Sequence, residues 1–124
     1  MAKSRYNINS LKAALQGLGY ALRHELNFRI EVGLGVLAVL LGAVLGIGLD
    51  EWFILMLMIG LVLSLELVNT GFERLSDVQT PHFDPQIKIA KDVSAAAVLV
   101  ASVAAAAVGF WLFIPRLLAV FGIL

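Results

Sequence analysis

Cysteine is absent from this chain of 124 residues, and charged residues are scarce. The first absence excludes disulfide bonds, thiolate metal sites and cysteine nucleophiles together. Charged residues make up only 15% of the chain and hydrophobic residues 60%, a balance too apolar for a soluble domain of this length. No basic tract indicates a nucleic-acid partner. The composition predicts that residues 1–124 form one small domain embedded in a membrane.

Long apolar stretches predict helices that cross the membrane. Residues 32–49 carry no charge and, at about 1.5 Å per residue, reach roughly 27 Å, close to the thickness of a bilayer core. Asp50 and Glu51 end this stretch, and Trp52 begins the next as an interface anchor. A third stretch ends at Pro115. The three spans are expected at about residues 28–49, 52–73 and 92–114.

Capping signals predict where other helices begin. Asp84 followed by Pro85 is a plausible N-cap with proline at the first helical position. Asn9 or Ser10 can cap an amphipathic helix over about residues 10–24. One face of that helix carries Leu11, Leu15, Leu18 and Leu22. Such a helix rests in the membrane interface or packs on its own protein.

The basic residues predict how the chain is oriented. They precede the first span or lie between the second and third spans, whereas the turn at residues 50–51 has none. These residues are Lys3, Arg5, Lys12, Arg23 and Arg29, and then Arg74, Lys88 and Lys91. Because basic loops stay in the cytoplasm, the N-terminus and the second connector are expected there.

The most informative feature is a polar stripe at the end of the second span. Glu66, Asn69, Glu73 and Asp77 follow one another at intervals of three or four residues, which places them on one helix face. Ionisable groups at membrane depth are costly, so a functional site is the default interpretation. A structural alternative is that Glu66 forms a polar contact between helices.

Oxygen ligands and lysine gather near the same membrane face. The set comprises Glu25, Glu31, Glu66, Asn69, Glu73, Asp77, Lys91 and Asp92. Carboxylates can hold Mg²⁺ together with substrate phosphates, and a lysine can balance phosphate charge. No Gly-x-x-x-x-Gly-Lys-Ser/Thr loop is present, so nucleotide chemistry must use another scaffold. The pattern favours phosphoryl transfer to a lipid alcohol.

Small residues recur at helical spacing in the spans. Gly42 and Gly46 lie four apart, and the third span carries a ridge of Ala97, Ala101, Ala105 and Gly109. Such ridges allow close contact between helices. Since three spans enclose little interior, they also favour self-association of the chain.

Several of these segments resemble the prokaryotic diacylglycerol kinase family, which includes undecaprenol kinases. The resemblance lies in residues 66–73 (ELVNTGFE) with Asp77, then residues 88–93 (KIAKDV) before an alanine-rich span. Residues 25–29 (ELNFR) are similar to the family's segment before its first span. The match runs from about Ser10 to Pro115 in the family's order. Gly71 stands where the motif commonly has alanine.

The resemblance implies an all-α integral membrane kinase with an N-terminal amphipathic surface helix and three transmembrane helices. It implies a homotrimer with active sites shared between subunits, in the bacterial cytoplasmic membrane with the site facing the cytoplasm. Its substrates would be MgATP and a membrane lipid alcohol. The residues leave open whether that alcohol is diacylglycerol or undecaprenol.

The resemblance also implies a role for each matching residue. Glu66 would be the base near the alcohol, and Glu25 with Glu73 would hold magnesium. The nucleotide would be bound by Glu25, Asn69, Glu73, Asp77, Lys91 and Asp92. Glu31 is placed beside the site. The match is weaker over the surface helix, where Arg5, Tyr6, Asn9 and Lys12 would contact nucleotide.

Two other classes of protein fit part of the pattern. A small oligomeric transporter could use Glu66 to bind cations or protons, although the polar residues cluster at one face and the spans number three. A membrane assembly module without catalysis would explain the small-residue ridges and leave the acidic stripe unexplained.

Overall fold

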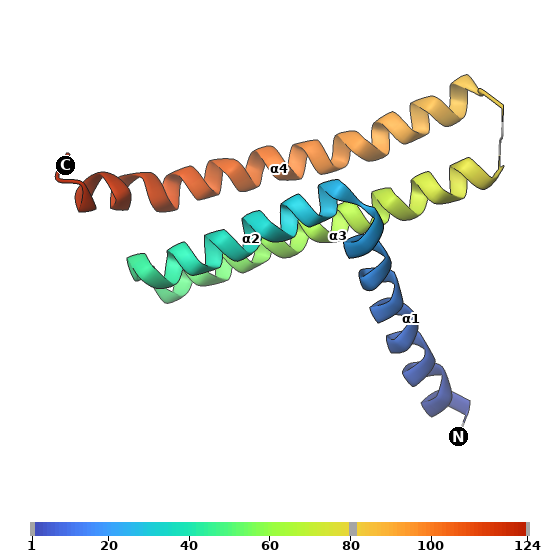
Figure 1. Cartoon of the computed structure of the whole chain (residues 1–124), viewed down its shortest axis with the longest axis horizontal. Helices are drawn as coiled ribbons and strands as arrows, with labels where there is room; N and C mark the ends of the chain where they lie inside the picture. The colour runs from blue at the N-terminus through green and yellow to red at the C-terminus, as the bar shows by residue number, and fades with distance from the viewer. Residues whose placement is uncertain (1, 80–81, 124) are drawn as a thin grey trace.

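The chain is described by a computed structural model that covers residues 2–79 and 82–123, with side chains described from residue 8 onward. Its elements in chain order are the helices α1 (Ala2–His24), α2 (Leu26–Leu45), α3 (Leu49–Gln79) and α4 (Pro85–Val120). Helices α2, α3 and α4 run along a common direction, and α1 leaves this bundle steeply from the start of α2 (Figure 1). The all-helical fold predicted from the sequence is confirmed.

Three of the helices, α2, α3 and α4, are long and apolar enough to cross a membrane. Large apolar side chains cover their outer surfaces; Leu57 and Val100, for example, are 72% and 70% exposed. Surfaces of this kind are stable in lipid and are rare on soluble monomers. The chain is therefore a membrane protein.

The start of α4 agrees with its predicted cap. Asp84 adopts an extended backbone, and its carboxylate accepts a hydrogen bond of 2.8 Å from the backbone N–H of Gln86. Pro85 occupies the first turn, where a missing N–H costs nothing. The connector therefore fixes where α4 begins relative to the end of α3.

Two helix ends differ from expectation. Helix α1 begins at Ala2 rather than at Asn9 or Ser10, because residues 2–9 contain no glycine or proline to stop it. Helix α4 continues past Pro115 to Val120. Proline removes one backbone hydrogen bond here without ending the helix, and the guanidinium of the next residue, Arg116, donates to the carbonyl of Leu112 at 2.9 Å.

The apolar core lies at the end of the bundle where α2 turns into α3. It contains Ile47, Leu55, Leu112 and Phe113, and the side chain of Leu112 is fully buried. Gly46 ends α2 in the left-handed conformation, with φ of 65°. Gly46 ends the helix, because glycine adopts the left-handed conformation without steric strain. Its spacing with Gly42 does not form a ridge of helix contacts in this chain.

An ion pair ties α4 to the same turn. Arg116 donates to the Glu51 carboxylate at 2.7 Å, and the backbone N–H of Gly48 donates to the same carboxylate oxygen at 2.8 Å. The pair neutralises the Glu51 carboxylate, and the exposed Asp50 adds a negative charge at the same end of the bundle.

Gly42 tests this packing. A Cβ atom added there would lie 3.0 Å from Ile47 Cδ1 and 3.1 Å from Trp52 Cη2. We expect Gly42→Leu to overpack the turn and destabilise the fold by about 1–3 kcal/mol. The measurement is thermal unfolding in detergent. Ala43→Leu, at the next and exposed position of α2, is the matched control; equal midpoints for the two variants would contradict the prediction.

Candidate functional site

Polar side chains are buried in the second half of α3. Glu66, Asn69 and Thr70 are 4%, 7% and 6% exposed, although the helix is apolar up to Leu65. The spacing of three and four residues places Glu66, Asn69 and Thr70 toward the neighbouring helices rather than toward lipid. Burial covers the first part of the stripe predicted from the sequence, whereas Glu73 is half-buried and Asp77 is exposed.

Three carboxylates, those of Glu25, Glu31 and Glu73, lie within electrostatic range of Glu66, and we call these four residues the acidic cluster. The negative charges of Glu73 and Glu25 both act on Glu66, and that of Glu66 acts on Glu31. The cluster combines the corner before α2, the body of α2 and the body of α3. Like charges held this close repel one another unless a cation or a proton compensates them.

Glu25 reaches the cluster because it lies at the corner between two helices. It is the one residue between α1 and α2, with extended φ and ψ of −111° and 107°. At this corner Arg29 donates to the carbonyl of Arg23 at 3.0 Å, which satisfies a carbonyl left open at the end of α1. The corner is therefore held by both side-chain and backbone contacts.

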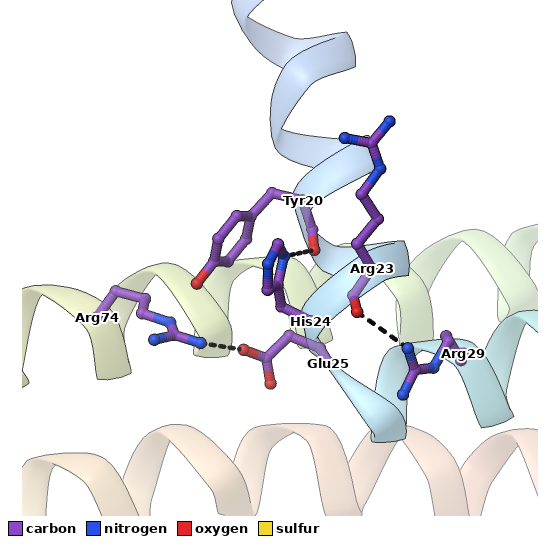
Figure 2. Close-up of polar contacts among 6 residues, drawn as sticks. All are labelled: Tyr20, Arg23, His24, Glu25, Arg29 and Arg74. Atoms are coloured by element: carbon purple, nitrogen blue, oxygen red, sulfur yellow. Dashed lines mark hydrogen bonds and ion pairs between the residues drawn. The ribbon is translucent and has the colours of Figure 1, made fainter.

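Basic side chains approach the carboxylates from two directions. Arg74 pairs with Glu25 at 3.0 Å, as Figure 2 shows, and Lys91 of α4 pairs with Asp77 at 2.9 Å. Lys91 also acts electrostatically on Glu73. Asp92 instead pairs with Lys88 at 2.6 Å, one turn away on α4. Lys91 thus lies beside Asp77 and Glu73, as its place in the predicted site requires. Asp92 makes its ion pair with Lys88 and not with the acidic cluster of its own chain.

Two buried acceptor atoms at this site have no hydrogen-bond partner in the described part of the chain. They are Oδ1 of Asn69 and Oε2 of Glu31. Buried polar atoms are nearly always satisfied in folded proteins, because leaving one unpaired costs free energy. Their presence indicates that a group outside this chain completes the site.

The nucleotide contacts expected from the surface helix stay predictions. Lys12 is exposed on α1, in a shallow groove that Leu15 and Tyr20 also line, and Asn9 is exposed as well. The side chains of Arg5 and Tyr6 lie outside the described residues. At its C-terminal end α1 presents Tyr20 stacked on His24 at 4.4 Å, with the Arg74 guanidinium 5.2 Å from the Tyr20 ring centre.

Sequence reasoning missed this aromatic contact and used Arg74 only as a sign of orientation. The position of Arg74 directly after Glu73 could have marked it. Nothing in the sequence marks Tyr20, because its role depends on how α1 meets α3.

The donor set fits magnesium bound together with a phosphate ligand. Among residues 2–79 and 82–123, no three Asp, Glu or His side chains already surround one point. Mg²⁺, however, is usually held by one or two carboxylates, with phosphates and water completing its shell. Glu25 and Glu73 supply such carboxylates, and the unpartnered oxygen of Asn69 is of the same hard type.

An apolar groove runs along the spans to the acidic cluster. It has a volume of about 540 Å³ and lies between α2, α3 and α4, with Glu31 among otherwise almost entirely apolar lining residues such as Leu34, Ile59 and Phe110. An alkyl chain fits this lining, and a polar end group beside Glu31 would meet the cluster.

Comparisons with known proteins give the site its context. The sequence pattern of the family described as "Prokaryotic diacylglycerol kinase" matches residues 12–113. An undecaprenol kinase of Bacillus subtilis is 34% identical over 102 residues, which cover 82% of this chain and 83% of that protein. A diacylglycerol kinase of Synechocystis sp. is 37% identical over 110 residues, covering 88% and 63%.

A diacylglycerol kinase of Helicobacter pylori is also similar, with 33% identity over 98 residues that cover 79% of this chain and 72% of that protein. The similarity spans the corner at Glu25, the stripe on α3 and most of α4. These relatives are kinases, and nothing in them supports the transporter alternative. The chain belongs to the prokaryotic diacylglycerol kinase family and is a membrane lipid kinase that phosphorylates a lipid alcohol.

Proposed function

We propose that the acidic cluster transfers the γ-phosphoryl group of MgATP to the hydroxyl of diacylglycerol or undecaprenol. The bond between the γ-phosphorus and the bridging oxygen of ATP breaks, a bond from the lipid oxygen forms, and the hydroxyl proton leaves. The observation that carries the proposal is Glu66, a carboxylate 4% exposed inside a membrane helix and surrounded by the charges of Glu25 and Glu73. Keeping a buried carboxylate in a membrane helix costs free energy, which favours a chemical role over a structural one.

Glu66 is proposed to accept the proton of the lipid hydroxyl. The apolar groove would hold the lipid chain, and Glu31, which lines the groove and interacts with Glu66, lies between the two. A base must lie within hydrogen-bonding reach of the proton that it removes. The groove supports this placement because it leads an alcohol from the lipid phase toward the carboxylate.

The nucleotide is proposed to bind on the polar side of the cluster. Glu25 and Glu73 would hold magnesium, which neutralises phosphate charge when it is bound. Asn69 would orient the phosphates by donating from its amide nitrogen, and its unpartnered Oδ1 would accept from water on the metal. Lys91, positioned by Asp77 at 2.9 Å, would balance their charge. Phosphoryl transfer needs mainly alignment and charge stabilisation, and these groups supply both.

We place the active site at the cytoplasmic face of a bacterial inner membrane. The cluster lies toward the end of the bundle that carries α1 and the connector between α3 and α4, while the Glu51–Arg116 pair marks the other end (Figure 1). Most basic residues lie at the cluster's end, as the positive-inside rule requires for cytoplasmic segments. ATP would then be available where the site opens.

We further propose that the site is completed in a homotrimer. Asp92 is 64% exposed and pairs with Lys88 instead of contacting its own acidic cluster, so it is free to act in the site of a neighbouring copy. The unpartnered atoms of Asn69 and Glu31 support the same arrangement. Helix α4 also exposes small residues such as Ala97 and Ala104, which permit close contact between helices.

The reaction and its base are tested together. We expect the purified chain to phosphorylate diacylglycerol or undecaprenol with MgATP in mixed micelles, measured as transfer of labelled phosphate. Glu66→Gln should lower kcat by at least about 10²-fold, because a general base typically contributes that much. Asp50→Asn removes an exposed carboxylate at the opposite end of the bundle and is the control. Retained activity in Glu66→Gln would remove it as the base, and no transfer by the wild type would remove the reaction.

The metal role of Glu73 predicts a changed magnesium requirement. Glu73→Ala should shift the Mg²⁺ concentration for half-maximal activity upward by about 10-fold or more, as loss of a ligand weakens metal binding. Activity is titrated with Mg²⁺ at fixed ATP, beside wild type and Asp50→Ala. An unchanged Mg²⁺ midpoint would assign Glu73 a role other than metal binding.

A site shared between subunits predicts complementation. Glu66→Gln and Asp92→Asn should each be inactive alone, and chains of both kinds assembled at equal amounts should recover about a quarter of wild-type activity if each site takes one residue from each neighbour. Mixing is carried out by unfolding and joint refolding, with each variant refolded alone as the control. No recovery in the mixture would mean that Glu66 and Asp92 serve the same chain's site, and full activity of Asp92→Asn alone would mean that Asp92 is dispensable.

A further inference from the structure

Arg74 forms a contact between elements that the mechanism above does not use. Its guanidinium Nη2 lies 3.0 Å from Oε1 of Glu25, across 49 positions of the sequence. The side chain of Arg74 remains 55% exposed, while that of Glu25 is 21% exposed. Figure 2 shows the guanidinium extending from α3 toward the corner between α1 and α2. Arg74 is thus in contact with the acidic cluster and still open to solvent.

The contacts of Arg74 hold its position without using all of its hydrogen-bonding capacity. One N–H donates to Glu25, and the guanidinium carbon lies 5.2 Å from the centre of the Tyr20 ring. Tyr20 is itself stacked on His24. A guanidinium carries five N–H donors in a planar fork that matches the oxygens of a phosphate. The contact with the ring helps to hold the guanidinium beside Glu25, and N–H donors remain available.

The charge of the site requires a cation at this position when nucleotide binds. The cluster contains four carboxylates, and Arg74 is the cation that contacts one of them directly within the described residues. A triphosphate would add further negative charge beside them. Lys91 approaches from α4 on the side of Asp77 and Glu73, and Arg74 approaches from the side of Glu25. Arg74 also interacts with Asp77, so both cations lie near the proposed nucleotide position.

We propose that Arg74 is a further nucleotide-binding residue, which pairs with Glu25 when no nucleotide is bound and donates to the phosphate oxygens when Glu25 holds the metal. This inference rests on the proposed function. Metal at Glu25 weakens its attraction for Arg74, and phosphate oxygens are strong acceptors for a guanidinium. The Glu25 contact thus keeps the fork beside the site before nucleotide arrives.

A purely structural role is the competing explanation. In that case Arg74 would only fasten α3 to the corner, and its loss would loosen Glu25 and α1 together. The two explanations predict different effects of the substitution on metal affinity in the absence of nucleotide. Removing a cation that competes for Glu25 should leave metal binding unchanged or tighter, whereas loosening the corner should weaken it.

The experiment measures binding as well as turnover. Equilibrium binding of ATP in the presence of Mg²⁺ and binding of Mn²⁺ alone are determined for the full chain in detergent micelles without lipid substrate. We expect Arg74→Ala to weaken ATP binding about 10-fold or more, the effect of losing a charge-assisted hydrogen bond, without weakening Mn²⁺ binding. The KM for MgATP should rise in parallel, with the KM for the lipid unchanged.

Three variants sharpen the test. Arg74→Gln keeps a neutral donor for Glu25 but lacks the charge, so it should bind ATP as poorly as Arg74→Ala and unfold at the wild-type temperature. Arg74→Lys should recover part of the affinity. Arg23→Ala removes a cation whose side chain points away from this contact in Figure 2 and should bind ATP like the wild type.

Two results would overturn the inference. One is wild-type ATP affinity in Arg74→Ala and Arg74→Gln. The other is a joint loss of ATP binding, Mn²⁺ binding and thermal stability in Arg74→Ala, with both binding activities normal in Arg74→Gln. Either result leaves the proposed function standing if the wild type phosphorylates a lipid. Failure of the wild type to bind ATP or phosphorylate lipid would overturn the proposed function itself.

Discussion

The electrostatic repulsion among buried carboxylates is the constraint on which the rest of this structure depends. Glu66 lies inside a membrane helix with the charges of Glu73 and Glu25 acting on it. Such an arrangement is unfavourable while all of the carboxylates are charged, because like charges repel and burial penalises the charged form. It becomes favourable when a metal, a proton or a basic group is added. The chain therefore keeps a site whose stability depends on what binds there.

The rest of the fold supplies the stability that this site lacks. The apolar core around Leu112, the left-handed turn at Gly46 and the Glu51–Arg116 ion pair all lie at the far end of the bundle. At the other end, α1 leaves the spans and Glu25 sits in the one extended position of the corner. Packing at one end of the bundle thus offsets the free-energy cost of unpaired polar atoms at the other end.

Sequence reasoning recovered the features that depend on spacing along one helix. The stripe of Glu66 and Asn69 follows from intervals of three and four residues, and the cap at Asp84 follows from its own short motif. Features formed between distant segments were not recoverable, because no local pattern encodes them. Arg116 pairs with Glu51 across 65 positions of the sequence, and Gly46 fits a contact spacing but ends a helix.

The structure gives information about Glu25 that the family resemblance did not. Its place in the family's segment implied a metal ligand, but it did not reveal that a guanidinium already contacts the same carboxylate. Under the proposal, Glu25 pairs with Arg74 before nucleotide binds and with magnesium afterwards. A cation neutralises Glu25 in both states, which avoids added repulsion with Glu66 within the cluster. Arg74 meets this need from α3, the helix that also carries Glu66 and Glu73. The proposed exchange of Arg74 for magnesium at Glu25 would therefore couple the corner between α1 and α2 to the phosphoryl transfer at α3.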